Sequence, residues 1–314
     1  MLPEVIAIVG PTAVGKSDLG LWLARELGGE IVNADALQVY RGLDIGTAKP
    51  TPEERQLVAH HLIDILDPDQ RFSAGEFARR AREVIAEVRA RGRRPILVGG
   101  SGFYYHALFH GLAPIPVPDE ETRARLRARL EREGLPSLLA ELGEHDPLTA
   151  SRLPPGDTQR ILRALEVWTA TGRPLSAWIA DPAPLTEPLS ALSIGLTLPR
   201  SILYHRIADR TVRMFQQGWV AEVRNLLDAG VSPEAIAFQA IGYREIVRHL
   251  ATGWSLEEAQ EETIRATRRF AKRQSTWFAR EEEISWFQAK EQKSLRQEIA
   301  SFLRNHRVGR AVDA

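Results

Sequence analysis

The chain alternates short, fully apolar runs with longer amphipathic stretches. Residues 5–9, Val-Ile-Ala-Ile-Val, are typical of a strand buried on both faces of a parallel sheet. Further runs at 30–34, 61–66, 95–98 and 191–198 give four more predicted strands. Leucines at helical spacing predict a helix after the first strand that stops at Gly28-Gly29. A capping box at Ser73 to Glu76 begins another, which runs to about Gly92.

Strands that alternate with helices indicate an α/β fold with a mainly parallel sheet flanked by helices. Residues 113–188 differ, because prolines mark both ends and Arg-rich helical patterns fill the interior without a convincing strand. We therefore predict a helical insertion at 113–188 in a core formed by 1–112 and 189–288. After Pro199 the core is expected to be helical to about residue 288. Residues 289–314 are expected to form a polar tail that frays.

Composition narrows the possible functions. The 314 residues suffice for two domains, or for one domain with a large insertion. The absence of cysteine excludes disulfides, thiolate catalysis and Cys-ligated metals. Lys+Arg and Asp+Glu are both 41, so only a local patch could bind nucleic acid. We see neither a signal peptide nor an apolar run of membrane-spanning length, and we expect a cytoplasmic protein without a membrane partner.

A phosphate-binding loop follows the first strand. The segment fits G-x-x-x-x-G-K-[ST] with Gly10, Pro11, Thr12, Ala13, Val14, Gly15, Lys16 and Ser17. Backbone N–H groups and a helix N-terminus can surround phosphate oxygens there, and Lys16 adds a positive charge. The Ser17 hydroxyl can coordinate Mg²⁺. The motif predicts a polyphosphate ligand, which need not be a nucleotide.

Two other polar segments end predicted strands. Residues 33–50 contain Asp35, which could hold a metal, act as a general base or cap a helix, and also one of the chain's five lysines, Lys49. Residues 99–102 form a second glycine-rich turn that could bring Ser101 to the phosphates. Ligands of open α/β sheets bind at this edge. These residues alone leave open a kinase that uses Asp35 to bind a small acceptor.

The motifs together resemble the tRNA dimethylallyltransferase (IPP transferase) family, collinearly from about residue 4 to 288. They are the phosphate loop, Asn33-Ala-Asp35 with Gln38 to Pro50, His60 to Asp64, Val98 to Gly102, Asp157 to Glu166, Ala240 to Glu245, and Ala271 to Phe278. The resemblance implies a P-loop NTPase-like fold. It also implies transfer of a dimethylallyl group from dimethylallyl diphosphate to N6 of the adenosine 3′ of the anticodon, in tRNAs that read codons beginning with U. Mg²⁺ is the implied cofactor, and tRNA and the diphosphate are the implied partners.

The resemblance also assigns roles. It makes Lys16, Asp35, Ser101 and Arg210 catalytic, with Thr12 beside Asp35. Asp35 would accept the proton of the adenine amine, and the other groups would stabilise the departing diphosphate. Arg206, Arg210 and Arg213 share one helical face, and the family pattern selects Arg210.

Several segments are implied to contact tRNA. Residues 264–280 hold six Lys/Arg and no Asp/Glu, which alone would indicate a solvated basic helix with an aromatic core stripe. With the resemblance, the helix becomes a phosphate-contacting surface. The implied tRNA contacts are Asp35, Ala36, Leu37, Gln38, Ser101, Arg123, Gln159, Arg160, Ile161, Leu162, Arg163, Gly242, Tyr243, Arg244, Lys272, Arg273, Gln274 and Trp277.

Three positions depart from the family pattern. Ala36 stands where Ser is usual, Ser101 where Thr is usual, and Phe103 where Leu is common. None removes a charged catalytic group, so activity is expected. His60-His61 has no third metal ligand in sight and is interpreted as strand-edge packing.

Three alternatives remain on the sequence alone. They are a small-molecule P-loop kinase, an adenylate isopentenyltransferase that acts on free AMP, and a tRNA-binding protein without catalysis. The helical insertion and the basic helix argue against the adenylate isopentenyltransferase, because an enzyme that acts on free AMP needs no surface for tRNA. No obligate protein partner is evident, and a monomer is expected.

Overall fold

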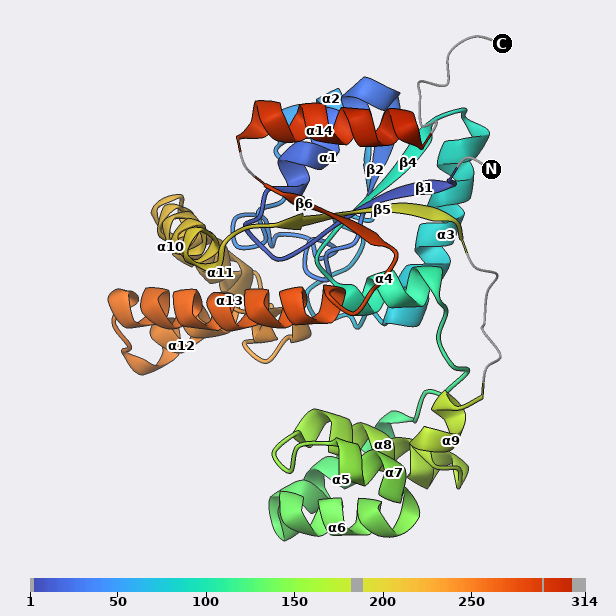
Figure 1. Ribbon diagram of the computed structural model, residues 1–314. Coiled ribbons are helices and arrows are strands. Elements are labelled where there is room, and N and C mark those ends of the chain that lie inside the picture. Colours follow the sequence, from blue (N-terminus) through green and yellow to red (C-terminus); the bar gives the residue numbers. More distant parts are fainter. Residues whose placement is uncertain (1–2, 182–188, 290, 307–314) are drawn as a thin grey trace. The chain divides into compact units, whose positions relative to one another are not determined.

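The computed structural model describes residues 3–181, 189–289 and 291–306 (Figure 1). The chain divides into two compact units. The first combines Met1–Phe109 with Leu189–Ala314, and the second is His110–Pro188. Among the described residues, none of the helices has the length and apolar character that crossing a membrane requires.

The first unit is built on a six-stranded parallel sheet. Its strands are β1 (Val5–Val9), β2 (Gly29–Asn33), β3 (His60–His61), β4 (Arg94–Val98), β5 (Ala191–Thr197) and β6 (Ile284–Gln288), in the order β3-β2-β4-β1-β5-β6. The central strand β1 is buried along its whole length, as its unbroken apolar run predicts. The predicted α/β class with a parallel sheet is therefore confirmed.

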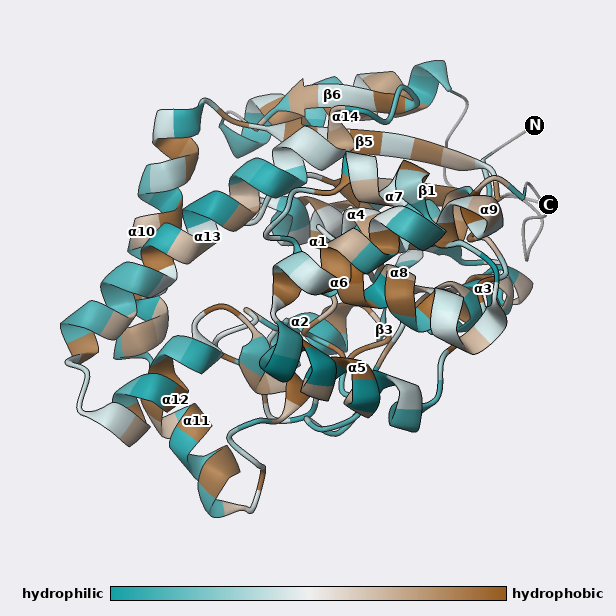
Figure 2. Ribbon diagram, turned by 90° about the horizontal axis from the view of Figure 1, so that it is seen from below, coloured by the Kyte–Doolittle hydropathy of each residue, from teal (hydrophilic) through white to brown (hydrophobic). Residues whose placement is uncertain are grey.

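Helices complete this unit. They are α1 (Lys16–Leu27), α2 (Pro52–Leu57), α3 (Ala74–Ala90), α4 (Gly102–Phe109), α10 (Arg200–Gln216), α11 (Trp219–Asp228), the 3₁₀ helix η1 (Ile236–Gln239), α12 (Tyr243–Thr252), α13 (Leu256–Phe278) and α14 (Gln292–Asn305). The predicted helical C-terminal region is thus present. Helix α13 is amphipathic, and hydrophilic and hydrophobic residues recur along it at helical spacing (Figure 2).

The second unit is all helical in its described part. It contains α5 (Glu120–Glu133), α6 (Leu135–His145), α7 (Pro147–Arg152), α8 (Thr158–Thr171) and α9 (Leu175–Ile179). A core of its own holds these helices together, with Leu126, Leu138, Leu142 and Ile161 almost fully buried. Of the predicted insertion, 182–188 lies outside the described residues.

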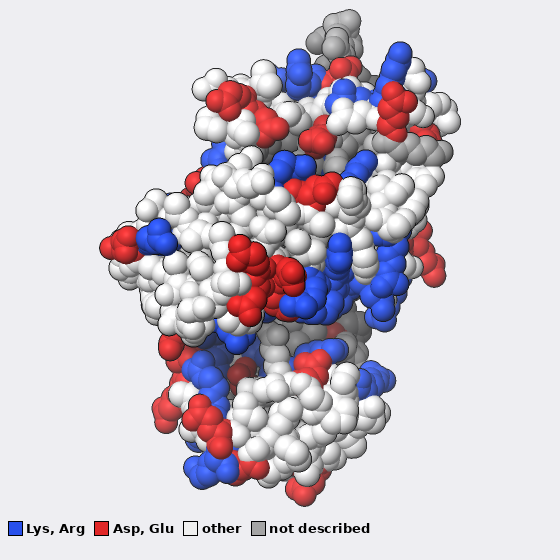
Figure 3. All heavy atoms as spheres, turned by 90° about the vertical axis from the view of Figure 1, so that its left-hand side faces the viewer, with Lys and Arg blue, Asp and Glu red and all other residues white. Residues whose placement is uncertain are grey.

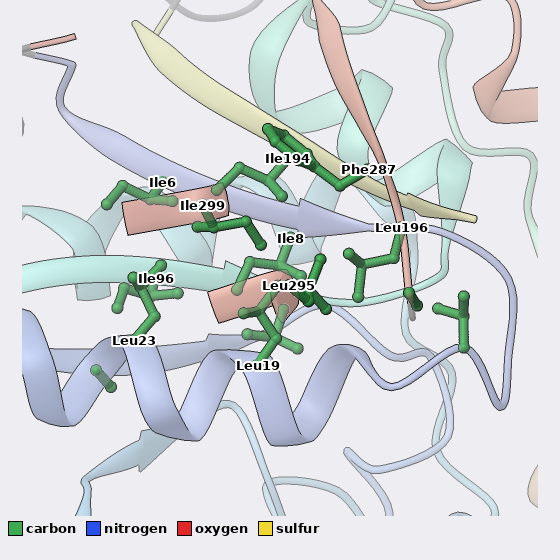
Figure 4. Close-up of a cluster of buried hydrophobic side chains, with 14 of the residues drawn as sticks. Ile6, Ile8, Leu19, Leu23, Ile96, Ile194, Leu196, Phe287, Leu295 and Ile299 are labelled. Atoms are coloured by element: carbon green, nitrogen blue, oxygen red, sulfur yellow. The ribbon is translucent and has the colours of Figure 1, made fainter. Parts of the chain in front are cut away.

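The prediction of a frayed tail at 289–314 was wrong for residues 292–305, while 290 and 307–314 lie outside the described residues. Helix α14 packs with α1 against the sheet, and Leu295 and Ile299 of α14 lie beside Ile8 and Ile194 of the strands (Figure 4). The apolar residues of α14 recur every fourth position, which places them on one helical face. The preceding segment is also corrected, because 284–288 is not helical but forms edge strand β6, paired with β5.

The strand predicted at 61–66 is much shorter than expected. Only His60–His61 pairs with β2, and the chain then turns through positive φ at Leu62 and Asp64. The turned segment follows the loop after β2 instead, since the Ile65 N–H donates to the Val39 carbonyl over 2.9 Å. His61 nevertheless lies at the strand edge as interpreted, with Nε2 2.6 Å from a Glu30 carboxylate oxygen.

Candidate active site

The phosphate loop connects β1 to α1, in the place the motif requires. Gly15 is the N-cap of α1 with φ 105°, and Ala13 also has positive φ, so the backbone turns tightly through this segment. The Lys16 ammonium donates to the Pro11 carbonyl over 2.8 Å. The lysine therefore folds back over the loop that would hold a phosphate.

Three loops meet at the carboxyl edge of the sheet. Because β2, β4 and β1 are neighbours, the loops that follow them emerge side by side. A Cβ at Gly99 would lie 2.2 Å from the Ala34 carbonyl oxygen, and one at Gly100 would lie 3.3 Å from that of Gly10. The second glycine-rich turn thus passes between the other two loops because it lacks side chains.

Asp35 begins the loop after β2. Its Oδ1 accepts the Leu37 N–H over 2.8 Å, and its own N–H donates to the buried Asn33 side chain over 3.1 Å. These bonds fix the carboxylate in an Asx turn. Burial raises the pKa of Tyr104, and the charge of Asp35 contributes to that rise, so the two side chains are near one another.

Arg210 reaches the phosphate loop from α10. Its Nη2 donates to the Thr12 hydroxyl over 2.6 Å. Burial lowers the pKa of Arg210, and the negative charge of Asp35 opposes this effect. Arg210, Thr12 and Asp35 thus lie in one cluster, although they are far apart in the sequence.

Lys16 belongs to the same cluster. Burial lowers the pKa of its ammonium to about 8, the charge of Asp35 raises it, and the charge of Arg210 lowers it further. Two cations and one carboxylate therefore share a partly desolvated site. Such a site attracts a polyanion, because a bound anion would offset the repulsion between the cations.

Oxygen ligands for a divalent cation are present at this point. Ser17 is exposed in the first turn of α1, directly after Lys16, and Gly15 has open space where a side chain would stand. A hydroxyl oxygen, together with phosphate oxygens of a substrate, belongs to the hard oxygen donors that Mg²⁺ prefers. These residues fit the implied metal.

Two charged residues hold the loop after β2 in shape. The Lys49 side chain is 2% exposed and donates to Asp44 over 2.7 Å and to Asp64 over 2.5 Å. The carboxylate of Glu222 on α11 accepts the Asp44 and Ile45 N–H groups over 2.9 and 2.6 Å. Lys49 could be noticed because lysine is rare in this chain, whereas no sequence signal marks Glu222.

Some residues implied to contact tRNA are buried. Tyr243 and Ile161 are both 0% exposed, and Gly242 is also buried, with the Trp219 ring filling the space of a Cβ. The side chains of Tyr243 and Ile161 thus pack inside the protein, and their contact with tRNA stays a prediction. Gln274 is only 8% exposed, and its amide is hydrogen-bonded to two loops of the active site. Its side chain is therefore occupied inside the protein, and its predicted contact with tRNA stays a prediction.

Other residues of α13 face solvent. Lys272 and Arg273 are exposed, whereas Arg269 is paired with Glu262 over 2.6 Å. Trp277 packs at the second glycine-rich turn, where a Cβ at Gly102 would lie 2.3 Å from its ring. On the face drawn in Figure 3, basic and acidic side chains lie among uncharged areas, and neither sign covers the face. The free basic surface of α13 is thus smaller than its five Lys/Arg suggest.

The remaining implied contacts are distributed as follows. Ala36, Leu37, Gln38 and Ser101 are partly exposed in the first unit, and Arg244 is exposed there. In the second unit, Gln159 and Arg160 are exposed at the start of α8, Leu162 and Arg163 are partly exposed, and Arg123 of α5 lies 3.9 Å from Glu166. The Gln38 amide donates to the Thr47 carbonyl over 3.1 Å, which ties it to its own loop.

Comparisons with known proteins give a consistent result. The model of the IPP transferase family matches residues 38–281. A curated tRNA dimethylallyltransferase of Geobacter sulfurreducens is 50% identical over 283 residues, which cover 90% of this chain and 91% of the relative. A solved tRNA isopentenylpyrophosphate transferase of Bacillus halodurans is 40% identical, with a TM-score of 0.70 and 96% of each chain covered.

A more distant solved structure is described as a eukaryotic dimethylallyltransferase acting on tRNA. It is 27% identical with a TM-score of 0.78, covering 99% of this chain and 81% of that one. The family model spans most of this chain, and the bacterial relatives are matched over nearly their whole length. The chain therefore belongs to the IPP transferase family.

Proposed function

We propose that this protein transfers a dimethylallyl group from dimethylallyl diphosphate to N6 of the adenosine 3′ of the anticodon, in tRNAs that read codons beginning with U. The observation that carries the proposal is the cluster of Asp35, Lys16 and Arg210 at the phosphate loop, in a chain of this family. A carboxylate for an amine proton thus lies beside cations for a leaving diphosphate.

The donor diphosphate would lie in the phosphate loop. The loop N–H groups and Lys16 would contact its oxygens, and the N-terminus of α1 would add its positive dipole. Ser17 would help to hold Mg²⁺ beside the diphosphate oxygens. Mg²⁺ would supply positive charge to the diphosphate as it leaves.

The acceptor amine would approach from the side of Asp35. A C–N bond forms as the C–O bond to the diphosphate breaks, and the bonding electrons leave with the diphosphate. Asp35 accepts the amine proton, which prevents a positive charge from remaining on the product. Arg210, Lys16 and Ser101 stabilise the charge on the departing group, and Thr12 orients Arg210 through their 2.6 Å hydrogen bond.

The tRNA would be held by residues that remain accessible. In the first unit these are Ala36 to Gln38, Ser101, Arg244, Lys272, Arg273 and Trp277, and in the second unit Arg123, Gln159, Arg160, Leu162 and Arg163. Contacts to phosphates would offset the few kcal/mol needed to take the adenine out of its stack. One chain contains all the groups named here, which supports action as a monomer.

A transfer assay tests this proposal. The protein, Mg²⁺, labelled dimethylallyl diphosphate and unmodified tRNA are incubated together, and label in precipitated RNA is counted. Parallel reactions replace the tRNA with AMP or the donor with ATP. We expect label in tRNA only. Label in AMP alone would favour the adenylate relative, ADP formed from ATP without transfer would favour a kinase, and binding of tRNA without either product would favour a non-catalytic protein.

A further inference from the structure

Gln274 is placed to link two loops of the active site. It lies on α13, more than 170 residues from either loop, and its side chain is 8% exposed. The Oε1 accepts the Thr12 N–H over 2.8 Å, and the Nε2 donates to the Gly100 carbonyl over 2.8 Å. One amide therefore joins the phosphate loop to the second glycine-rich turn.

The bonded backbone groups lie beside the reacting groups. Thr12 also accepts the hydrogen bond from Arg210, and Gly100 immediately precedes Ser101. The fit at Gly100 is close, because a Cβ there would lie 2.4 Å from the Gln274 Nε2. A shift of the Gln274 amide would thus move Thr12 and Ser101 relative to one another.

An amide meets the requirements of this position, whereas other side chains of its size do not. It must accept from an N–H and donate to a carbonyl at the same time. A glutamate could accept from Thr12, but its ionised carboxylate would face the Gly100 carbonyl without a proton to donate. A methionine of similar length would leave both backbone groups without their partner.

We propose that Gln274 is a positioning residue for the transfer reaction, which rests on the function proposed above. It keeps the phosphate loop and the Ser101 turn at the spacing that the transition state needs. Because Gln274 belongs to the helix that exposes Lys272 and Arg273, the surface proposed to bind tRNA is attached directly to the donor site.

Single-turnover kinetics test this role with Gln274→Glu and Gln274→Met. The matched control is Gln297→Glu, the same change at an exposed glutamine of α14. At saturating donor and tRNA, we expect both Gln274 variants to transfer about 10- to 100-fold more slowly, the range that small misplacements of reacting groups produce. The dissociation constant for tRNA, measured without donor, should change less than about twofold, which is below 0.5 kcal/mol by the usual conversion. The control should match the wild type.

The other outcomes would overturn the inference. Weaker tRNA binding with an unchanged rate at saturation would make Gln274 a binding residue. Unchanged kinetics would show that the bridge has no role. If circular dichroism showed that both variants fail to fold, the role of Gln274 would be to stabilise the fold and not to position the reacting groups. Failure of the proposed function can be distinguished from failure of this inference, because the wild type and Gln297→Glu would then show no transfer either.

Discussion

Replacement of Asp35 by Asn tests the proposed proton acceptor with little disturbance of the loop. The Asp35 Oδ1 accepts the Leu37 N–H over 2.8 Å, and an asparagine Oδ1 can accept the same bond. The Asx turn is therefore retained, and the variant loses only the negative charge and the basic oxygen. Removal of a general base typically lowers a rate by about 10²- to 10⁴-fold. This corresponds to about 3 to 5 kcal/mol in the barrier.

The charge of Asp35 also affects its neighbours. It raises the pKa values of Lys16 and Arg210, so its removal lowers the pKa of Lys16 further and weakens the cationic site at neutral pH. Donor binding would weaken as a second effect. Single-turnover transfer at saturating donor separates the two effects, because the lower affinity then no longer limits the rate.

The matched control is Asp69→Asn, the same substitution at an exposed aspartate. We expect it to transfer at the wild-type rate. A loss below about fivefold for Asp35→Asn at saturating donor would refute the reasoning, since it falls short of the lower bound for a general base. A loss seen only at low donor concentration would reduce Asp35 to an electrostatic partner of Lys16.

Further predictions concern Lys16, Lys49 and Ile299. Because burial lowers the pKa of Lys16 to about 8, its ammonium loses its proton above that pH, and the affinity for dimethylallyl diphosphate should fall by up to about tenfold per pH unit. In the donor-free protein, the unfolded chain keeps the Lys16 proton up to the ordinary lysine pKa of 10.5, whereas the folded chain loses it above about pH 8, so the Lys16 contribution to stability should rise with pH between these values. Calorimetric titration with the donor tests the affinity, and thermal melts of wild type and Lys16→Met test the stability. A wild-type affinity that stays flat to about pH 9.5 would contradict the first prediction. Lys49→Met removes a buried cation from Asp64 and the Tyr40 carbonyl and should lower the free energy of unfolding in urea by about 1–3 kcal/mol. The control Lys293→Met changes an exposed lysine and should cost little. Equal unfolding midpoints for the two variants would show that Lys49 does not hold the loop after β2. Ile299→Ala should cost about 2–5 kcal/mol because Ile299 is fully buried, against less than about 0.5 kcal/mol for the exposed Gln297→Ala, and equal costs would mean that α14 does not pack on the sheet.

Strands, helices and the phosphate loop could be predicted wherever they depend on the order of apolar, polar and glycine residues along a short segment. The apolar run at Val5–Val9 predicts a buried strand, and the glycines around Lys16 mark the phosphate loop. The helix α14 was missed because its apolar stripe, with Leu295 and Ile299, is sparse within a polar segment. The short strand β3 was overextended because an apolar run does not show that Leu62 and Asp64 adopt positive φ.

The candidate site depended more on tertiary contacts. Lys16 could be named from the phosphate-loop motif, and Asp35 and Arg210 from the family resemblance, but the hydrogen bond from Arg210 to Thr12 joins residues 198 positions apart. Gln274 lies in a basic segment, and local pattern suggests a surface residue there. Its burial follows from partners on two distant loops, which periodicity cannot reveal. The carboxylate of Glu222 went unnoticed for the same reason.

The position of the transferred group tests the central claim most directly. Unmodified tRNA with adenosines across the 3′ edge of its anticodon is incubated with the protein, Mg²⁺ and dimethylallyl diphosphate, and nuclease fragments are sequenced by mass spectrometry. The account predicts a five-carbon adduct on the base of the adenosine immediately 3′ of the anticodon, formed at least about 100-fold more slowly with Asp35→Asn. An adduct elsewhere in the tRNA, or no adduct with intact tRNA and donor, would contradict it.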